Sequence, residues 1–127
     1  MRSFLATIAL ASIGFAPWKL ALATEDVDKF LRALLRPAGW SAEWSGPSGS
    51  GRTDVIFVRQ GNGFLAKIQL ISPVEMTCEN TALVESNTVT FDGCRDKQVK
   101  LTFDANDSAV PLRGRSPRGY EWTLRPK

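Results

Sequence analysis

The sequence of 127 residues contains no histidine and only two cysteines, Cys78 and Cys94. Without histidine, the Ser-His-Asp and Cys-His arrangements of hydrolases cannot be assembled. A zinc site would lack ligands, and the spacing of the cysteines is not the C-x-x-C of a redox pair. These absences exclude the common forms of nucleophilic, zinc and thiol-redox catalysis.

Carboxylates are the catalytic groups that remain. Most of the candidate aspartates fall in expected turns, where Asp forms local hydrogen bonds; the candidates are Asp54, Asp92, Asp96, Asp104 and Asp107. Nothing in the sequence places two of them at the roughly 5–9.5 Å separation that glycoside hydrolysis requires. Residues 104–107 lack the glycine and the final glutamate of a helix-loop calcium site. We therefore expect a protein that is not an enzyme, with no catalytic residue, no metal and no cofactor.

The first 23 residues have the pattern of a signal peptide. A basic start is followed by an apolar run over residues 4–16, and the small-residue pattern at residues 21–23 predicts cleavage before Thr24. Lys19 interrupts the run too early for a membrane span of about 20 residues, although an uncleaved anchor is the alternative. No cysteine follows the cleavage site to carry a lipid. We expect a periplasmic or secreted protein with no transmembrane segment in the mature chain.

Removal of this leader leaves residues 24–127, which are enough for one domain and too few for two. The net charge falls from +3 to +1 because Arg2 and Lys19 are lost, so the composition does not favour a nucleic-acid partner. In an oxidising compartment the two remaining cysteines are expected to pair, which predicts a Cys78–Cys94 disulfide. We expect the domain to be a monomer.

Residues 25–36 show the period of a one-sided helix. The apolar positions recur at i, i+3, i+4, i+7 and i+8, and they are Val27, Phe30, Leu31, Leu34 and Leu35. Acidic residues at the start and a proline and a glycine after the end delimit the helix. We expect the apolar face to pack against its own domain; a membrane- or partner-binding face is the alternative.

After the helix the apolar period changes to two. Strands are expected at residues 40–45, 53–59, 64–70, 74–78, 81–84, 88–91, 99–103, 109–115 and 120–125. Residues 46–51 are expected to form a flexible loop, and residues 60–63 and 116–119 to form tight turns. Short connections without a second helix predict an all-β fold: an antiparallel up-and-down β-barrel of about eight strands with one N-terminal amphipathic helix. An open two-sheet sandwich is the alternative.

The short helix, the Gly39-Trp40 pair that opens the first strand, and the hairpin-linked strands that end in an Arg-bearing strand resemble the calycin or lipocalin-like plan. This resemblance implies that Trp40 closes the base of the barrel with Arg125 over its ring, although Trp44 is a second candidate for that tryptophan. The stretches "FDGC" and "LRGRSPRGYEWTLRP" are similar to the closing hairpins of small exported bacterial β-barrel domains of unassigned function.

For such a barrel we expect a binding function rather than catalysis. We expect the interior to be filled by side chains, with a small apolar ligand as the alternative. The candidate ligand-binding residues are Trp40, Trp44, Phe57, Phe64 and Trp122.

A second set of residues is a candidate for binding a protein of the cell envelope, because it lies in expected mobile or charged turns: Ser48, Ser50, Arg113, Arg115 and Arg118. Ordinary solvated turns are the alternative reading of these residues. The chain also resembles periplasmic lysozyme inhibitors in size, compartment and a Ser-Gly-rich loop, although here that loop precedes both cysteines. We therefore expect a non-catalytic binding or structural protein, with an inhibitor of lysozyme or another envelope enzyme, or a carrier of a small apolar ligand, as alternatives.

Overall fold

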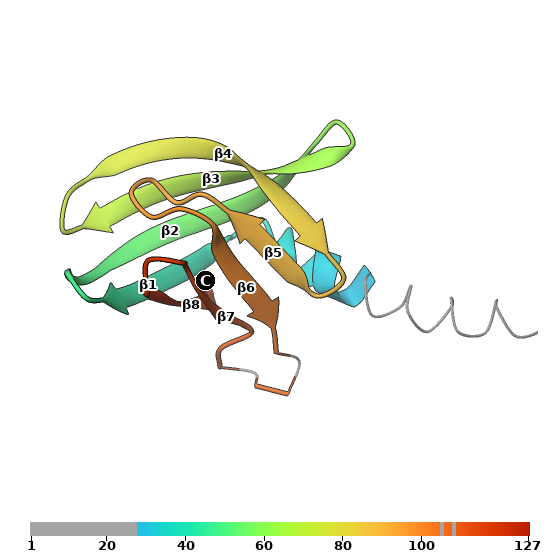
Figure 1. Ribbon diagram of the computed structural model, residues 1–127. Coiled ribbons are helices and arrows are strands. Elements are labelled where there is room, and N and C mark those ends of the chain that lie inside the picture. Colours follow the sequence, from blue (N-terminus) through green and yellow to red (C-terminus); the bar gives the residue numbers. More distant parts are fainter. Residues whose placement is uncertain (1–27, 105, 108) are drawn as a thin grey trace, which may run out of the picture.

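The computed structural model describes residues 28–127 apart from 105 and 108. The expected signal peptide at residues 1–23 and the expected start of the helix lie outside this part. Eight antiparallel strands follow one another around a closed barrel, and the last pairs with the first (Figure 1). The strands are β1 (Trp40–Gly46), β2 (Gly49–Gln60), β3 (Gly63–Ser72), β4 (Met76–Glu85), β5 (Thr88–Phe91), β6 (Val99–Phe103), β7 (Leu112–Arg115) and β8 (Glu121–Pro126). The expected up-and-down barrel is confirmed, and the alternative of an open sandwich is wrong.

Residues 28–34 form a helix at the end of the barrel where β6 ends (Figure 1). Phe30 and Leu34, four residues apart on one face, are buried in the core, and the ring of Phe30 lies 5.6 Å from that of Phe103. The indole Nε1 of Trp40 donates a hydrogen bond to the carbonyl oxygen of Leu34 at 3.1 Å, which satisfies an acceptor at the end of the helix. The helix therefore closes this end of the barrel.

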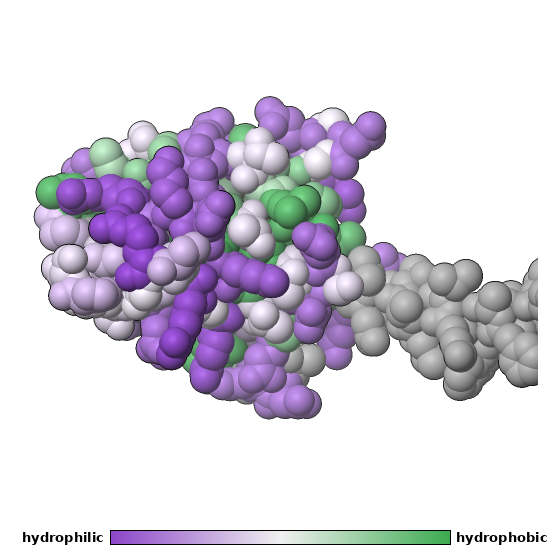
Figure 2. Space-filling model, viewed as in Figure 1, coloured by the Kyte–Doolittle hydropathy of each residue, from purple (hydrophilic) through white to green (hydrophobic). Residues whose placement is uncertain are grey.

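The inward-facing side chains of the strands form one hydrophobic core. In β3, for example, Ala66, Ile68 and Leu70 are buried, whereas Lys67 and Gln69 are exposed, as the two-residue period of a strand requires. The outer surface is mostly hydrophilic on the face seen in Figure 2. The expected filled interior is present next to the helix, but a cavity occupies the other end of the barrel.

The Ser-Gly-rich segment at residues 46–51 is strand rather than the expected flexible loop. Only residues 47–48 form a turn, and β1 and β2 pair as far as Gly46 and Gly49. The ring of Tyr120 occupies the space where Gly46 would carry a Cβ, and the ring of Trp44 does the same at Gly51. Contacts between strands thus override a composition that is usual for loops.

Two other strand boundaries differ from the expectation. Residues 76–78 of the strand expected at 74–78 join the strand expected at 81–84 in one strand, β4, because Glu79 and Asn80 between them pair with β3; residues 74 and 75 lie outside it. The strand expected at residues 109–115 begins only at Leu112. The carboxylate of Asp107 accepts hydrogen bonds from the backbone N–H groups of residues 109 and 110, so this segment is held as a turn.

Trp40 does lie at the closed end of the barrel, but its cationic partner is not Arg125. The guanidinium of Arg36, just after the helix, lies over the Trp40 ring at 5.6 Å from the centroid. Arg125 alternates with the buried Leu124, so its side chain lies on the outer wall, where Nη1 contacts Glu43 Oε1 at 3.2 Å. The contact implied by the calycin resemblance is therefore made by a residue outside the strands.

Candidate ligand-binding site

A cavity of about 670 Å³ lies at the end of the barrel away from the helix. It is bordered by the connections from β1 to β2, β3 to β4, β5 to β6 and β7 to β8, which share one end of an up-and-down barrel. Its volume lies within the range of about 300–1,000 Å³ that is usual for small-molecule sites. We call it the mouth cavity; its lining includes Trp44, Thr53, Arg95, Asp96, Arg118 and Trp122.

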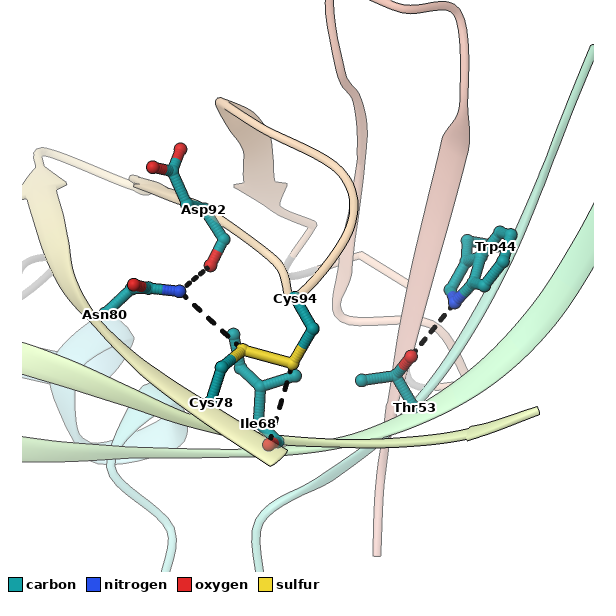
Figure 3. The surroundings of a disulfide bond; sticks show 7 residues. All are labelled: Trp44, Thr53, Ile68, Cys78, Asn80, Asp92 and Cys94. Carbon is teal, nitrogen blue, oxygen red and sulfur yellow. Dashed lines mark hydrogen bonds between the residues drawn. A yellow bond between two sulfur atoms is a disulfide. The ribbon is translucent and has the colours of Figure 1, made fainter. Parts of the chain in front are cut away.

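Aromatic rings form one wall of the mouth cavity. Trp44 of β1 and Trp122 of β8 are register partners, and their ring centroids lie 6.2 Å apart in a stacked arrangement. Tyr120 meets Trp44 edge to face at 5.7 Å. Trp44 is half-buried, and its Nε1 donates a hydrogen bond to Thr53 Oγ1 at 2.9 Å (Figure 3). These contacts fix the orientation of the Trp44 ring while leaving part of it open to a ligand.

The predicted disulfide between Cys78 and Cys94 is confirmed, with 5.7 Å between the two Cα atoms. It joins β4 to the β5–β6 loop, residues 92–98, so it anchors one rim of the mouth cavity (Figure 3). Beside it, Asn80 Nδ2 donates a hydrogen bond to the carbonyl oxygen of Asp92 at 2.8 Å. Gln98 N donates to the Asp92 carboxylate at 2.9 Å and fixes the other end of the loop.

Asp96 lies in this loop and lines the mouth cavity with a buried side chain. The residue is only 8% exposed. Its Oδ2 accepts a hydrogen bond from Trp122 Nε1 at 2.9 Å, and its Oδ1 accepts one from the backbone N–H of Lys97 at 3.1 Å. Among the described residues no basic side chain forms an ion pair with it. Both carboxylate oxygens are thus engaged with groups of the protein, and the Trp122 ring is held in place by one of them.

Two arginines, Arg95 and Arg118, supply positive charge at the rim. The guanidinium of Arg118 lies over the Tyr120 ring at 5.4 Å from the centroid, and its Nη1 donates a hydrogen bond to the carbonyl oxygen of Arg95 at 3.2 Å. The β7–β8 turn is thereby tied to the β5–β6 loop. In the part of the chain that the structure describes, neither arginine forms an ion pair.

The structure brings together only some of the residues singled out from the sequence. Trp44 and Trp122 lie on the mouth cavity, and so do three candidates for partner binding, Ser48, Ser50 and Arg118.

The other candidates lie elsewhere. Trp40 and Phe57 are fully buried, and Phe64 lies near the β2–β3 turn under the guanidinium of Arg59. Arg113 and Arg115 are exposed and pair with Asp107 and Glu121, respectively. None of these five lines the mouth cavity.

Sequence reasoning missed Arg95 and took Asp96 for an ordinary turn residue. The only available signal was their position directly after Cys94, because a disulfide fixes the loop that follows it. The position of Tyr120 under the Arg118 guanidinium was also not predicted.

Within residues 28–127, leaving out 105 and 108, no three His, Cys, Asp or Glu side chains gather in a way that could hold a metal ion. The helix in this range is too short and too polar to cross a membrane. Comparison with protein-family models, curated proteins and solved structures found no match to this chain. The geometry of the mouth cavity is therefore the basis on which a function is proposed.

Proposed function

We propose that this protein is a non-catalytic binding protein that takes a small ligand into the mouth cavity. The observation that carries the proposal is the combination of a cavity of about 670 Å³ with a half-open aromatic wall whose rings are fixed by hydrogen bonds. A cavity of this size lies in the range of small-molecule sites, and its lining combines aromatic and aliphatic side chains with polar and charged ones. The helix and the packed core close the other end, so a ligand enters and leaves by the mouth.

The absence of catalysis is part of the proposal. The chain has no histidine, and both cysteines are consumed by the disulfide. Asp96 is the one carboxylate among the residues that line the mouth cavity. A mechanism that uses two carboxylates would need a second one close by.

The proposal includes export to the periplasm or the medium and a calycin-like relationship. The leader-like pattern of residues 1–23 supports export, and the disulfide is of the kind that persists in oxidising compartments. An eight-stranded up-and-down barrel with one closed end and one open end supports the calycin-like plan.

The other two hypotheses from the sequence fare differently. The likeness to lysozyme inhibitors was one of size, compartment and a Ser-Gly-rich loop; most of that segment is strand in β1 and β2, and the inhibitor hypothesis stays a prediction. The carrier hypothesis gains the cavity, but Arg95, Asp96 and Arg118 make its rim charged rather than apolar.

Indole N–H signals in ¹H–¹⁵N NMR spectra test the proposal with an internal control. We expect ligands from a small-molecule collection to shift the signals of Trp44 and Trp122, which line the mouth cavity. The Trp40 signal should stay in place, because its N–H is buried against Leu34 at the closed end. A collection in which no compound shifts the first two signals, or in which binders shift only that of Trp40, would contradict the proposal.

A further inference from the structure

The charged groups of the mouth cavity indicate what kind of ligand it accepts. The side chains that line it include two guanidinium groups, of Arg95 and Arg118, and one carboxylate, of Asp96. The lining therefore carries a net charge of +1. Arg95 and Arg118 are exposed at the rim, so water solvates their charge when the cavity is empty; a ligand with one negative charge would gain their attraction, and an uncharged ligand would not.

The three charged groups are not equally available to a ligand. The Asp96 oxygens already accept hydrogen bonds from Trp122 Nε1 and from the backbone N–H of Lys97, and its side chain is buried. The Arg118 guanidinium is held over Tyr120 and uses Nη1 on the Arg95 carbonyl, which leaves its other N–H groups free. A basic ligand would have to compete for a carboxylate that is already engaged. An acidic ligand would meet arginines without ion pairs among the described residues.

The remaining lining sets the shape of the ligand's neutral part. The half-buried Trp44 ring, stacked on Trp122, offers a flat apolar wall, and Ile68 and Leu70 contribute aliphatic surface. Flat apolar groups stack well on such a wall. Carboxylate, sulfonate and phosphate groups are bound well by the planar fork of arginine.

We propose that the ligand is an organic monoanion with a flat apolar body, whose acidic group binds Arg95 and Arg118 and whose body lies against Trp44. This inference rests on the proposed function, because it names the class of molecule that the mouth cavity takes. It differs from the carrier hypothesis in requiring the negative charge.

Two dyes that differ only in a negative charge test the charge requirement. 8-Anilinonaphthalene-1-sulfonate is a permanent monoanion, and N-phenyl-1-naphthylamine is the same ring system without the sulfonate. We expect the sulfonate to bind at one saturable site at least about tenfold more tightly than the neutral dye, as measured by fluorescence titration of the full chain. Raising the salt from about 0.1 M to 1 M shortens the screening length from about 10 Å to 3 Å. This change should weaken binding of the sulfonate dye and leave binding of the neutral dye unchanged.

Substitution of the two arginines tests the charge requirement, because it removes the positive charge and keeps the cavity. The double variant Arg95→Gln/Arg118→Gln should reduce the affinity for the sulfonate to that for the neutral dye, and the affinity for the neutral dye should not change. Arg59→Gln is the matched control. Arg59 is also exposed, and its guanidinium also lies over an aromatic ring, 5.3 Å from the centroid of Phe64, but it does not line the mouth cavity. Unchanged thermal unfolding of the variants would show that the fold is retained.

The outcomes distinguish the two proposals. If the neutral dye binds as tightly as the sulfonate, or if the double variant does not change the affinity for the sulfonate, the monoanion proposal is wrong while ligand binding stands. If neither dye saturates a site, or if Trp44→Leu changes the affinity for neither, binding in the mouth cavity is wrong as well.

Discussion

The tryptophan N–H groups at the two ends of the barrel donate hydrogen bonds to different kinds of acceptor. At the closed end, the Trp40 N–H donates to a backbone carbonyl of the helix, and the ring is completely buried. At the open end, Trp44 and Trp122 donate to the side chains of Thr53 and Asp96. The buried Trp40 ring contributes to stability. Trp44 and Trp122 are oriented by side-chain hydrogen bonds at the edge of a cavity, as residues of a pre-organised binding site are.

The arginines at the two ends also differ in how fully their N–H groups are used by the protein. Arg36 lies over Trp40, and its Nη2 donates to the carbonyl oxygen of Lys127, so it joins the helix to the end of β8. Arg118 lies over Tyr120 at the rim and joins two loops, but it keeps donors that no carboxylate of the described chain occupies. The contacts at the closed end therefore stabilise the fold, whereas the open end keeps charged donors that the proposed ligand binding would use.

The largest expected effect comes from truncating a tryptophan at each end. Trp40→Ala should lower the free energy of unfolding by about 3–5 kcal/mol, because it empties a fully buried site. Trp44→Ala should cost roughly 1–2 kcal/mol, because the ring is half-buried and loses less apolar contact. Guanidinium chloride unfolding of both variants measures the difference. An equal or larger loss for Trp44→Ala would mean that the open end is as structural as the closed one.

The next effect concerns the disulfide, which anchors only the open end. The double variant Cys78→Ser/Cys94→Ser should lower the free energy of unfolding by about 3 kcal/mol in the chain-entropy model for a loop of this length. Amide hydrogen exchange should accelerate over residues 92–98 by more than the global loss of stability explains, and over residues 28–34 only by that loss. Equal acceleration at both ends would show that the disulfide stabilises the barrel as a whole rather than the rim.

The closed end and the core were easier to predict from the sequence than the mouth. Periodicity depends on residues close in the chain, so it predicted the helix and the closing strand at residues 120–125. It also indicated Trp44 and Trp122 as candidates, and closure of the barrel makes them register partners.

The rim could not be predicted because it is assembled from polar turns that have no period. Arg95 and Arg118 are 23 residues apart, and the pairing of β6 with β7 places their two loops side by side. The Ser-Gly-rich segment was predicted as a loop for a related reason. Its glycines suggested flexibility, but the ring that packs over Gly51 belongs to Trp44 on the neighbouring strand. Arg125 was paired with Trp40 by resemblance, but strand alternation turns it outward.

The smallest expected effect tests whether the packing of the Trp44 ring over Gly51 sets the orientation of that ring in the mouth cavity. In Gly51→Ala the new methyl group would overlap the Trp44 ring and the Ser72 carbonyl oxygen, so the ring and the adjacent backbone must both shift, at a cost of about 1–3 kcal/mol in the free energy of unfolding. Gly63→Ala is the matched control, since Gly63 is also a strand glycine but has only one atom within 4 Å of the added carbon, at 3.8 Å. Trp44 indole N–H shifts and dye titration should change for Gly51→Ala and not for Gly63→Ala. If Gly51→Ala bound both dyes as tightly as the unaltered chain, the position of the Trp44 ring would not govern binding, and the contrast between the two ends would reduce to a difference in stability.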